Sequence, residues 1–104
     1  NIYTKEVEDA LYTHPAVLEC AVIGIPDERW GEAVHAVVIL KRGFKKGVNV
    51  TEEELIAHVK DQIARYKAPK SITFKRSLPK SAQGKILKKD LRVKFWKGKE
   101  RSIN

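Results

Sequence analysis

The segment Leu78-Pro79-Lys80-Ser81-Ala82-Gln83-Gly84-Lys85 contains residue types that could do chemistry. Pro79, Ser81 and Gly84 are turn-forming residues, so the segment predicts a turn with a lysine at its end. The ammonium of Lys85 is a compact point charge that suits the oxygens of a phosphate or a carboxylate. Two interpretations follow: an anion-binding lysine held by a turn, or an ordinary basic turn on the surface.

The pair Gly84-Lys85 also resembles the end of a phosphate-binding P-loop, but the surrounding residues exclude that motif. A P-loop needs a glycine where this chain has Pro79, and a Ser or Thr where it has Ile86. We therefore expect no Gly-rich phosphate cradle.

The histidines and the single cysteine do not form a recognisable catalytic or metal-binding pattern. His14, His35 and His58 have no ligand-like spacing with Cys20, so we expect no metal site and no Cys-His nucleophile. His35 and His58 are expected to be ordinary structural or surface residues. Cys20 lies in an apolar run and is expected to be a small buried hydrophobe. A lone cysteine favours a reducing compartment, so we expect a cytoplasmic protein.

Aromatic residues near cations form a second candidate site. Trp30 lies in a polar stretch, where it either anchors the loop or offers a flat face to a ligand. Tyr66 and Lys70 flank Ala68-Pro69, which places an aromatic ring and a basic group close together. Such a pair suits an adenine nucleotide carrying phosphates.

Length and charge limit the class of protein. The 104 residues are enough for one compact domain, and the net charge is +8. Residues 1–64 hold seven basic and eleven acidic residues, a net charge of −4, whereas residues 65–104 hold fourteen and two, a net charge of +12. The basic half is suited to nucleic acid, acidic lipid or phosphorylated small molecules. We expect no signal peptide, because residues 1–11 are already rich in charge, and no apolar run long enough for a membrane span.

Hydrophobic periodicity predicts the elements of the first half of the chain. Thr4 is predicted to cap a short helix over Lys5–Tyr12. Two β-branched runs, residues 17–25 and 32–40, predict buried strands. These strands should pair antiparallel, because the loop between them, residues 24–31, is short.

The second half begins with a capping box, in which Thr51 is followed by Glu54 three residues later. It should start a helix that residues 66–69 close. A half-buried strand is predicted over Ser71–Lys75. After the lysine turn, a basic amphipathic helix should present one apolar face made of Leu87, Leu91 and Phe95. The predicted fold is α+β, with helices packed on a small sheet of about three main strands.

Five stretches, in order, resemble the C-terminal domain of the adenylate-forming enzymes and most closely that of the acyl-CoA synthetases. They are Asn1–Glu8, His14–Asp27, Trp30–Glu32, Tyr66–Lys70 and Leu78–Lys85. The resemblance covers roughly residues 1–95 and implies a mobile lid domain that occupies the whole chain, residues 1–104. It also implies that an N-terminal domain of the same protein, outside residues 1–104, binds ATP, magnesium and a carboxylic acid.

The resemblance also implies roles for individual residues. Lys85 matches the lysine that bridges the carboxylate and the α-phosphate as acyl-AMP forms. The lid then rotates, and another face guides CoA for thioester formation. Trp30, Tyr66 and Lys70 match positions that contact the CoA nucleotide in a related aryl-CoA ligase.

Two departures from the pattern matter. An arginine can stand in that ligase where this chain has Ala68, so one phosphate contact is missing, and family members often carry proline in place of Thr4. The ATP-binding motifs are also absent, so this fragment alone is expected to be inactive and to bind none of the cofactors tightly.

Two other functions fit part of the sequence. The first is the lid of an adenylation domain that loads a carrier protein. The second is a small basic nucleic-acid-binding module, supported by the charge of residues 65–104. Against the second, Trp30 lies in the acidic half and no RNA- or DNA-binding motif is present, so we expect no nucleic-acid partner.

Overall fold

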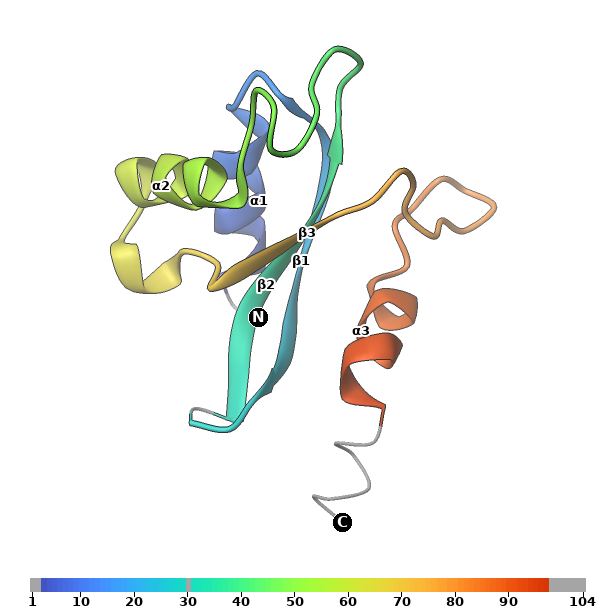
Figure 1. The fold of residues 1–104 in the computed structure, drawn as a ribbon. Coiled ribbons are helices and arrows are strands. Elements are labelled where there is room, and N and C mark those ends of the chain that lie inside the picture. The colour runs from blue at the N-terminus through green and yellow to red at the C-terminus, as the bar shows by residue number, and fades with distance from the viewer. Residues whose placement is uncertain (1–2, 30, 98–104) are drawn as a thin grey trace.

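The computed structural model describes residues 3–29 and 31–97 of the chain (Figure 1). Its elements in chain order are α1 (Thr4–Tyr12), β1 (Val17–Asp27), β2 (Gly31–Leu40), α2 (Glu52–Gln62), the 3-10 helix η1 (Arg65–Lys67), β3 (Ser71–Phe74) and α3 (Lys88–Trp96). The predicted order of helix, two strands, helix, strand and helix is confirmed, with η1 added before the last strand.

The three strands form one mixed sheet in the order β1-β2-β3. β1 and β2 pair antiparallel, as predicted, and β3 lies parallel to β2. A parallel neighbour requires a crossover, which α2 supplies. Figure 1 shows α1 and α2 on one side of the sheet and α3 on the other. The predicted α+β class is confirmed.

Both faces of the sheet are buried, because apolar residues occupy successive positions and successive side chains of a strand point to opposite faces. The face toward α1 and α2 carries Cys20, Val22, Ala36, Val38 and Ile72. The face toward α3 carries Ala21, Ile23, Val37 and Ile39, which pack with Leu78 and Leu91. Cys20 is 2% exposed, and burial raises the pKa of its thiol to about 12. Cys20 is therefore the buried hydrophobe that the sequence predicted.

The loop predicted over residues 24–31 is shorter than expected. β1 continues to Asp27 and β2 begins at Gly31, so only residues 28–30 connect the strands. Pro26 pairs with Glu32 inside the ladder. An edge strand tolerates proline, because its outer N–H positions need no partner in the sheet, and β1 is at the edge. Trp30 lies outside the described residues.

The predicted helix caps are partly correct. Thr51 caps α2, since its hydroxyl accepts a hydrogen bond from the Glu54 backbone N–H at 3.0 Å. The prediction for α1 is wrong, because Thr4 is already helical, Tyr3 is the N-cap and no side chain caps that end. The helix expected to close at residues 66–69 ends at Gln62 instead.

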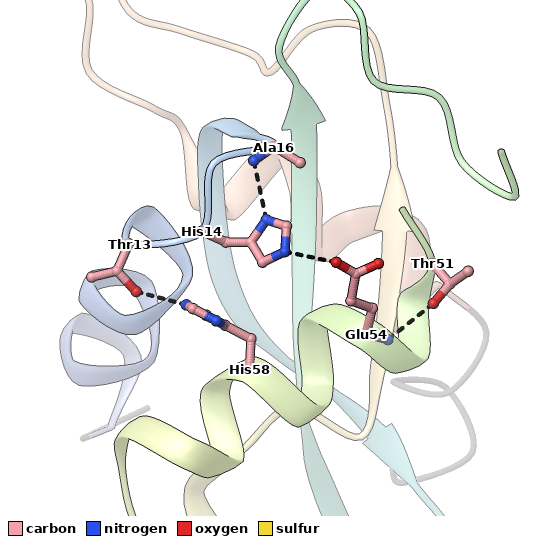
Figure 2. Close-up of polar contacts among 6 residues, drawn as sticks. All are labelled: Thr13, His14, Ala16, Thr51, Glu54 and His58. Atoms are coloured by element: carbon pink, nitrogen blue, oxygen red, sulfur yellow. Dashed lines mark hydrogen bonds and ion pairs between the residues drawn. The ribbon is translucent and has the colours of Figure 1, made fainter. Parts of the chain in front are cut away.

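A polar network joins the end of α1 to α2 (Figure 2). His14 Nδ1 accepts from the backbone N–H of Ala16 at 3.0 Å, which leaves the ring proton on Nε2. That Nε2 lies 3.0 Å from a carboxylate oxygen of Glu54. Beside this contact, His58 Nε2 lies 2.7 Å from the hydroxyl of Thr13. Of the two roles expected for His58, structural or surface, this contact supports the structural one, and the Glu54 carboxylate contacts His14 just after the end of α1.

The last helix, α3, does not include all three residues of the predicted apolar face, Leu87, Leu91 and Phe95. Leu91 is buried and Phe95 is half-buried, as predicted. Leu87 is 37% exposed and precedes the helix, which begins at Lys88. Its backbone N–H donates to the carbonyl of Pro79 at 2.8 Å, which keeps residue 87 in the turn. Over the described ranges, no helix combines the length and the apolar character that crossing a bilayer requires.

Candidate functional site

The segment that carries Lys85 is a small hairpin. Lys80 and Ile86 form an antiparallel bridge. Inside it, the N–H of Ser81 donates to the Lys85 carbonyl at 2.8 Å, and the N–H of Gly84 donates to the Ser81 carbonyl at 2.9 Å. Gly84 has φ of +86°, a region that is open to glycine and costs other residues about 1–2 kcal/mol. The predicted turn is confirmed.

Two apolar residues and one ion pair attach this hairpin to the sheet. Leu78 is 6% exposed and belongs to the core beneath α3, and Ile86 packs against the same core. The ammonium of Lys80 lies 2.5 Å from the carboxylate of Glu19 on β1. Both ends of the hairpin are therefore held, while its tip projects from the body of the domain as the orange loop in Figure 1.

Lys85 is exposed near this tip, and it makes no ion pair with residues 3–29 or 31–97. Its neighbours differ, since Lys80 is paired with Glu19 and Lys88 with Glu8. The Lys85 ammonium is thus available to an anion from outside the domain. A lysine held in this way can offset charge where two anionic groups must approach one another.

Tyr66 lies on η1, and its ring contacts Tyr3, the residue that precedes α1. The ring meets that of Tyr3 edge to face, with 5.8 Å between centroids. The ammonium of Lys67 lies 5.8 Å from the Tyr66 ring centroid and 2.9 Å from a carboxylate oxygen of Glu6. This hydrogen bond to Glu6 raises the pKa of Lys67. Tyr66 itself stays 69% exposed and can offer a ring face to a ligand.

Lys70 follows η1, and its backbone N–H donates to the carbonyl of Val34 on β2 at 2.8 Å. Tyr66 and Lys70 line a common open hollow of about 450 Å³ between the end of α2 and η1. Its charged wall is formed by Lys60, Arg65 and Lys70. Ala68 and Pro69 are buried beneath it. The structure therefore brings Tyr66 and Lys70 together, as predicted, and adds two cations.

The two groups of predicted site residues do not meet. The hairpin of Lys85 and the η1 segment lie on opposite sides of the sheet in Figure 1. Lys60 and Arg65 were missed from the sequence. The basic run around Tyr66 was a usable signal for Arg65. Lys60 could not be found in this way, because it lines the hollow only as a result of how the chain turns after α2.

Comparisons with known proteins identify the family to which this chain belongs. Residues 6–85 match the family described as the AMP-binding enzyme C-terminal domain. A feruloyl-CoA synthase from an Amycolatopsis species is 46% identical over 95 residues, which cover 91% of this chain and 18% of that protein. A fatty acid–acyl-carrier-protein ligase from Streptomyces coeruleorubidus is 39% identical over 104 residues, 100% of this chain and 19% of that protein.

Among solved structures, an acyl-CoA synthetase from Brucella canis matches with a TM-score of 0.86 and 42% identity, covering 92% of this chain and 18% of that chain. The chain belongs to the AMP-binding enzyme C-terminal domain family. It spans less than a fifth of the length of these relatives.

Proposed function

We propose that this chain is the C-terminal lid domain, residues 1–104, of a larger AMP-forming acid–CoA ligase. Its partners are an ATP-binding domain of the same protein, a carboxylic acid and CoA, and ATP and magnesium are used by the complete enzyme. The observation that carries the proposal is the position of Lys85, which makes no ion pair with residues 3–29 or 31–97, on a hairpin fixed by a glycine at the end of the family match over residues 6–85.

Lys85 acts in the first half-reaction, in which the acid carboxylate attacks the α-phosphate of ATP and pyrophosphate leaves. Two anionic groups approach, and negative charge develops on the phosphoryl oxygens. The Lys85 ammonium contacts the carboxylate and the α-phosphate and stabilises that charge. The exposure of this side chain and its lack of an ion pair within the described residues support this role.

The face that carries Tyr66 and Lys70 acts in the second half-reaction. The Tyr66 ring packs on the adenine of CoA, and Lys70 contacts a phosphate of the same nucleotide. Trp30, which follows β1 in the connection to β2, contributes a second aromatic surface. The hollow beside Tyr66 fits a nucleotide, because it combines an exposed ring with cationic walls.

A second candidate acceptor is an acyl carrier protein. The relative from Streptomyces coeruleorubidus, whose similarity extends over the whole chain, is named as a ligase for that acceptor. Both candidates share the first half-reaction and differ only in the thiol that receives the acyl group. The cations around Tyr66 favour CoA, since its nucleotide supplies both a base and phosphates.

The test uses the longer protein that joins this chain to its ATP-binding domain. It is incubated with ATP, magnesium and a panel of carboxylic acids, and thioester formation is measured with CoA and with an acyl carrier protein. We expect acid-dependent pyrophosphate release followed by acyl-CoA formation, and no release from the 104-residue chain alone. Thioester on the carrier protein but not on CoA would favour the second candidate. Robust pyrophosphate release by the chain alone would contradict the lid role.

A further inference from the structure

The hairpin that carries Lys85 lies between two ion pairs. The ammonium of Lys80, on its first leg, lies 2.5 Å from the carboxylate of Glu19 on β1. The ammonium of Lys88, three residues beyond Lys85, lies 2.7 Å from the carboxylate of Glu8 on α1. The chain is therefore tied to a different element before and after Lys85.

Glu8 is the more firmly held of the two carboxylates. Its Oε2 accepts a hydrogen bond from the backbone N–H of Val22 at 2.8 Å, and the same oxygen faces Lys88. Because β1 is at the edge of the sheet, this carboxylate takes the place of a neighbouring strand at Val22. The Glu8 side chain is 19% exposed, against 30% for that of Glu19. A carboxylate fixed by the backbone in this way offers Lys88 a partner of fixed position.

The apolar contacts of the hairpin hold its base but not its direction. Leu78 and Ile86 pack against the core beneath α3, whereas residues 82–85 are exposed. Hydrophobic contacts are not directional, so they permit the base to tilt on the sheet. A charge-assisted hydrogen bond is directional and fixes which side of each leg meets the body of the domain. The two ion pairs are thus suited to setting the direction in which Lys85 leaves the sheet.

We propose that Glu8 and Glu19 are positioning residues for acyl-adenylate formation, which act through Lys88 and Lys80 to hold the hairpin in the orientation that Lys85 needs. The inference rests on the proposed function and adds two acidic residues to it. Neither carboxylate contacts a substrate in this assignment. A displacement of about 1 Å at a reacting group can slow a reaction about a hundredfold, so weak contacts that fix an orientation can matter for the rate.

The test follows both half-reactions of the longer protein by single-turnover kinetics in Glu8→Gln, Glu19→Gln and the variant with both changes. Glu8→Gln removes the charge but keeps an oxygen that can accept from the N–H of Val22. Each single variant should slow acyl-adenylate formation about fivefold, the factor that corresponds to the loss of about 1 kcal/mol from a partly exposed ion pair. The double variant should slow it about twentyfold, since the two pairs hold different legs.

The expected loss is confined to the rate of one half-reaction. The KM values for ATP and the acid, and thioester formation from supplied acyl-adenylate, should stay within about twofold of the wild type. Lys88→Arg keeps the charge and should retain the adenylation rate, whereas Lys88→Ala should behave like Glu8→Gln. The reversed pair, Glu19→Lys with Lys80→Glu, should recover most of the rate that Glu19→Gln loses. Such rescue separates the ion pairs from a general loss of folding.

Asp9→Asn is the matched control, because it breaks an exposed ion pair of α1, with Lys5 at 3.3 Å, that does not involve the hairpin. It should change neither half-reaction. Unchanged adenylation in both Glu8→Gln and Glu19→Gln would overturn the positioning role. Equal slowing of both half-reactions would overturn it too, since the carboxylates would then act only through the stability of the domain.

Lys85→Ala, measured in parallel, distinguishes this inference from the proposed function. Slow adenylation by Lys85→Ala, combined with wild-type rates in the two glutamate variants, would overturn the positioning role alone. Wild-type adenylation by Lys85→Ala would overturn the proposed function and this inference together.

Discussion

At the scale of single residues, Lys85 depends on the glycine before it. The left-handed φ of Gly84 closes the turn through hydrogen bonds with Ser81. A Cβ at Gly84 would meet no atom within 4 Å, so Gly84→Ala changes backbone preference without creating a clash. We expect the substitution to raise the free energy of the left-handed backbone conformation at residue 84 by about 1–2 kcal/mol, so that other turn conformations become favoured.

In the longer protein, Gly84→Ala should therefore slow acyl-adenylate formation about tenfold, while thioester formation from supplied acyl-adenylate is retained. Gly84→Asn should be milder, since Asn tolerates this region better. Both half-reactions can be followed by single-turnover kinetics. An unchanged adenylation rate in Gly84→Ala would show that the position of Lys85 does not depend on this turn.

His35 gives the domain a pH-dependent term in its stability. Its side chain is 3% exposed on β2, with Nδ1 2.6 Å from the Ser71 hydroxyl and Nε2 2.9 Å from the Thr73 hydroxyl. A neutral ring satisfies both contacts, because hydroxyls both donate and accept. Burial lowers the pKa of His35, and the nearby Glu52 opposes this shift in part.

Because the folded-state pKa of His35 is lowered, its contribution to stability is complete above the unfolded pKa, about 6.5, and is lost as the pH falls below that value. The free energy of unfolding of the 104-residue chain, measured by urea denaturation, should therefore decline from pH 7 toward pH 5. His35→Gln should make this decline shallower. A variant with the same pH dependence as the wild type would exclude His35 as its source.

At the scale of elements, the sequence predicted most of the fold from its periodicity. The apolar runs of β1 and β2 predicted buried strands, and Thr51 predicted the start of α2 correctly. The turn around Gly84 and the proximity of Tyr66 and Lys70 were also predicted from the sequence, because each depends on residues close together in the chain.

The errors arose where the outcome depends on contacts between distant residues. Pro26 was predicted to lie in a loop, yet it lies in β1, because a strand at the edge of a sheet accommodates proline. Leu87 fits the helical period, but its hydrogen bond to Pro79 keeps it in the turn. Lys60 carries no local signal, and only the return of the chain from α2 into η1 makes it part of a basic hollow.

The layer formed by α3 should be the more easily separated one. α3 covers its face of the sheet through Leu91, 4% exposed, with Phe95 and Ile86 packed around it. Leu91→Ala should destabilise the domain by about 2–4 kcal/mol. Because α1 and α2 pack in a separate core, amide hydrogen exchange should accelerate most in α3 and in the segment preceding it. Uniform acceleration through α1 and α2 would show that the two cores unfold together.

At the scale of the whole molecule, the domain places its two candidate sites apart. The Lys85 hairpin belongs to the α3 side, and the Tyr66 hollow belongs to the α1 and α2 side (Figure 1). One fixed orientation toward an ATP-binding domain does not place both in the same active site. Our account therefore assigns one half-reaction to each side, with rotation of the domain between them.

The most direct test of this account measures both half-reactions in the longer protein carrying Lys85→Ala, with Lys45→Ala as an exposed-lysine control. Acyl-adenylate formation should fall at least about a hundredfold in Lys85→Ala, because the charge between carboxylate and α-phosphate is lost. Thioester formation from supplied acyl-adenylate should stay within about threefold of the wild type, and Tyr66→Ala should show the reverse pattern. Adenylation by Lys85→Ala within about threefold of the wild type would contradict the account, since Lys85 would then be an ordinary surface lysine.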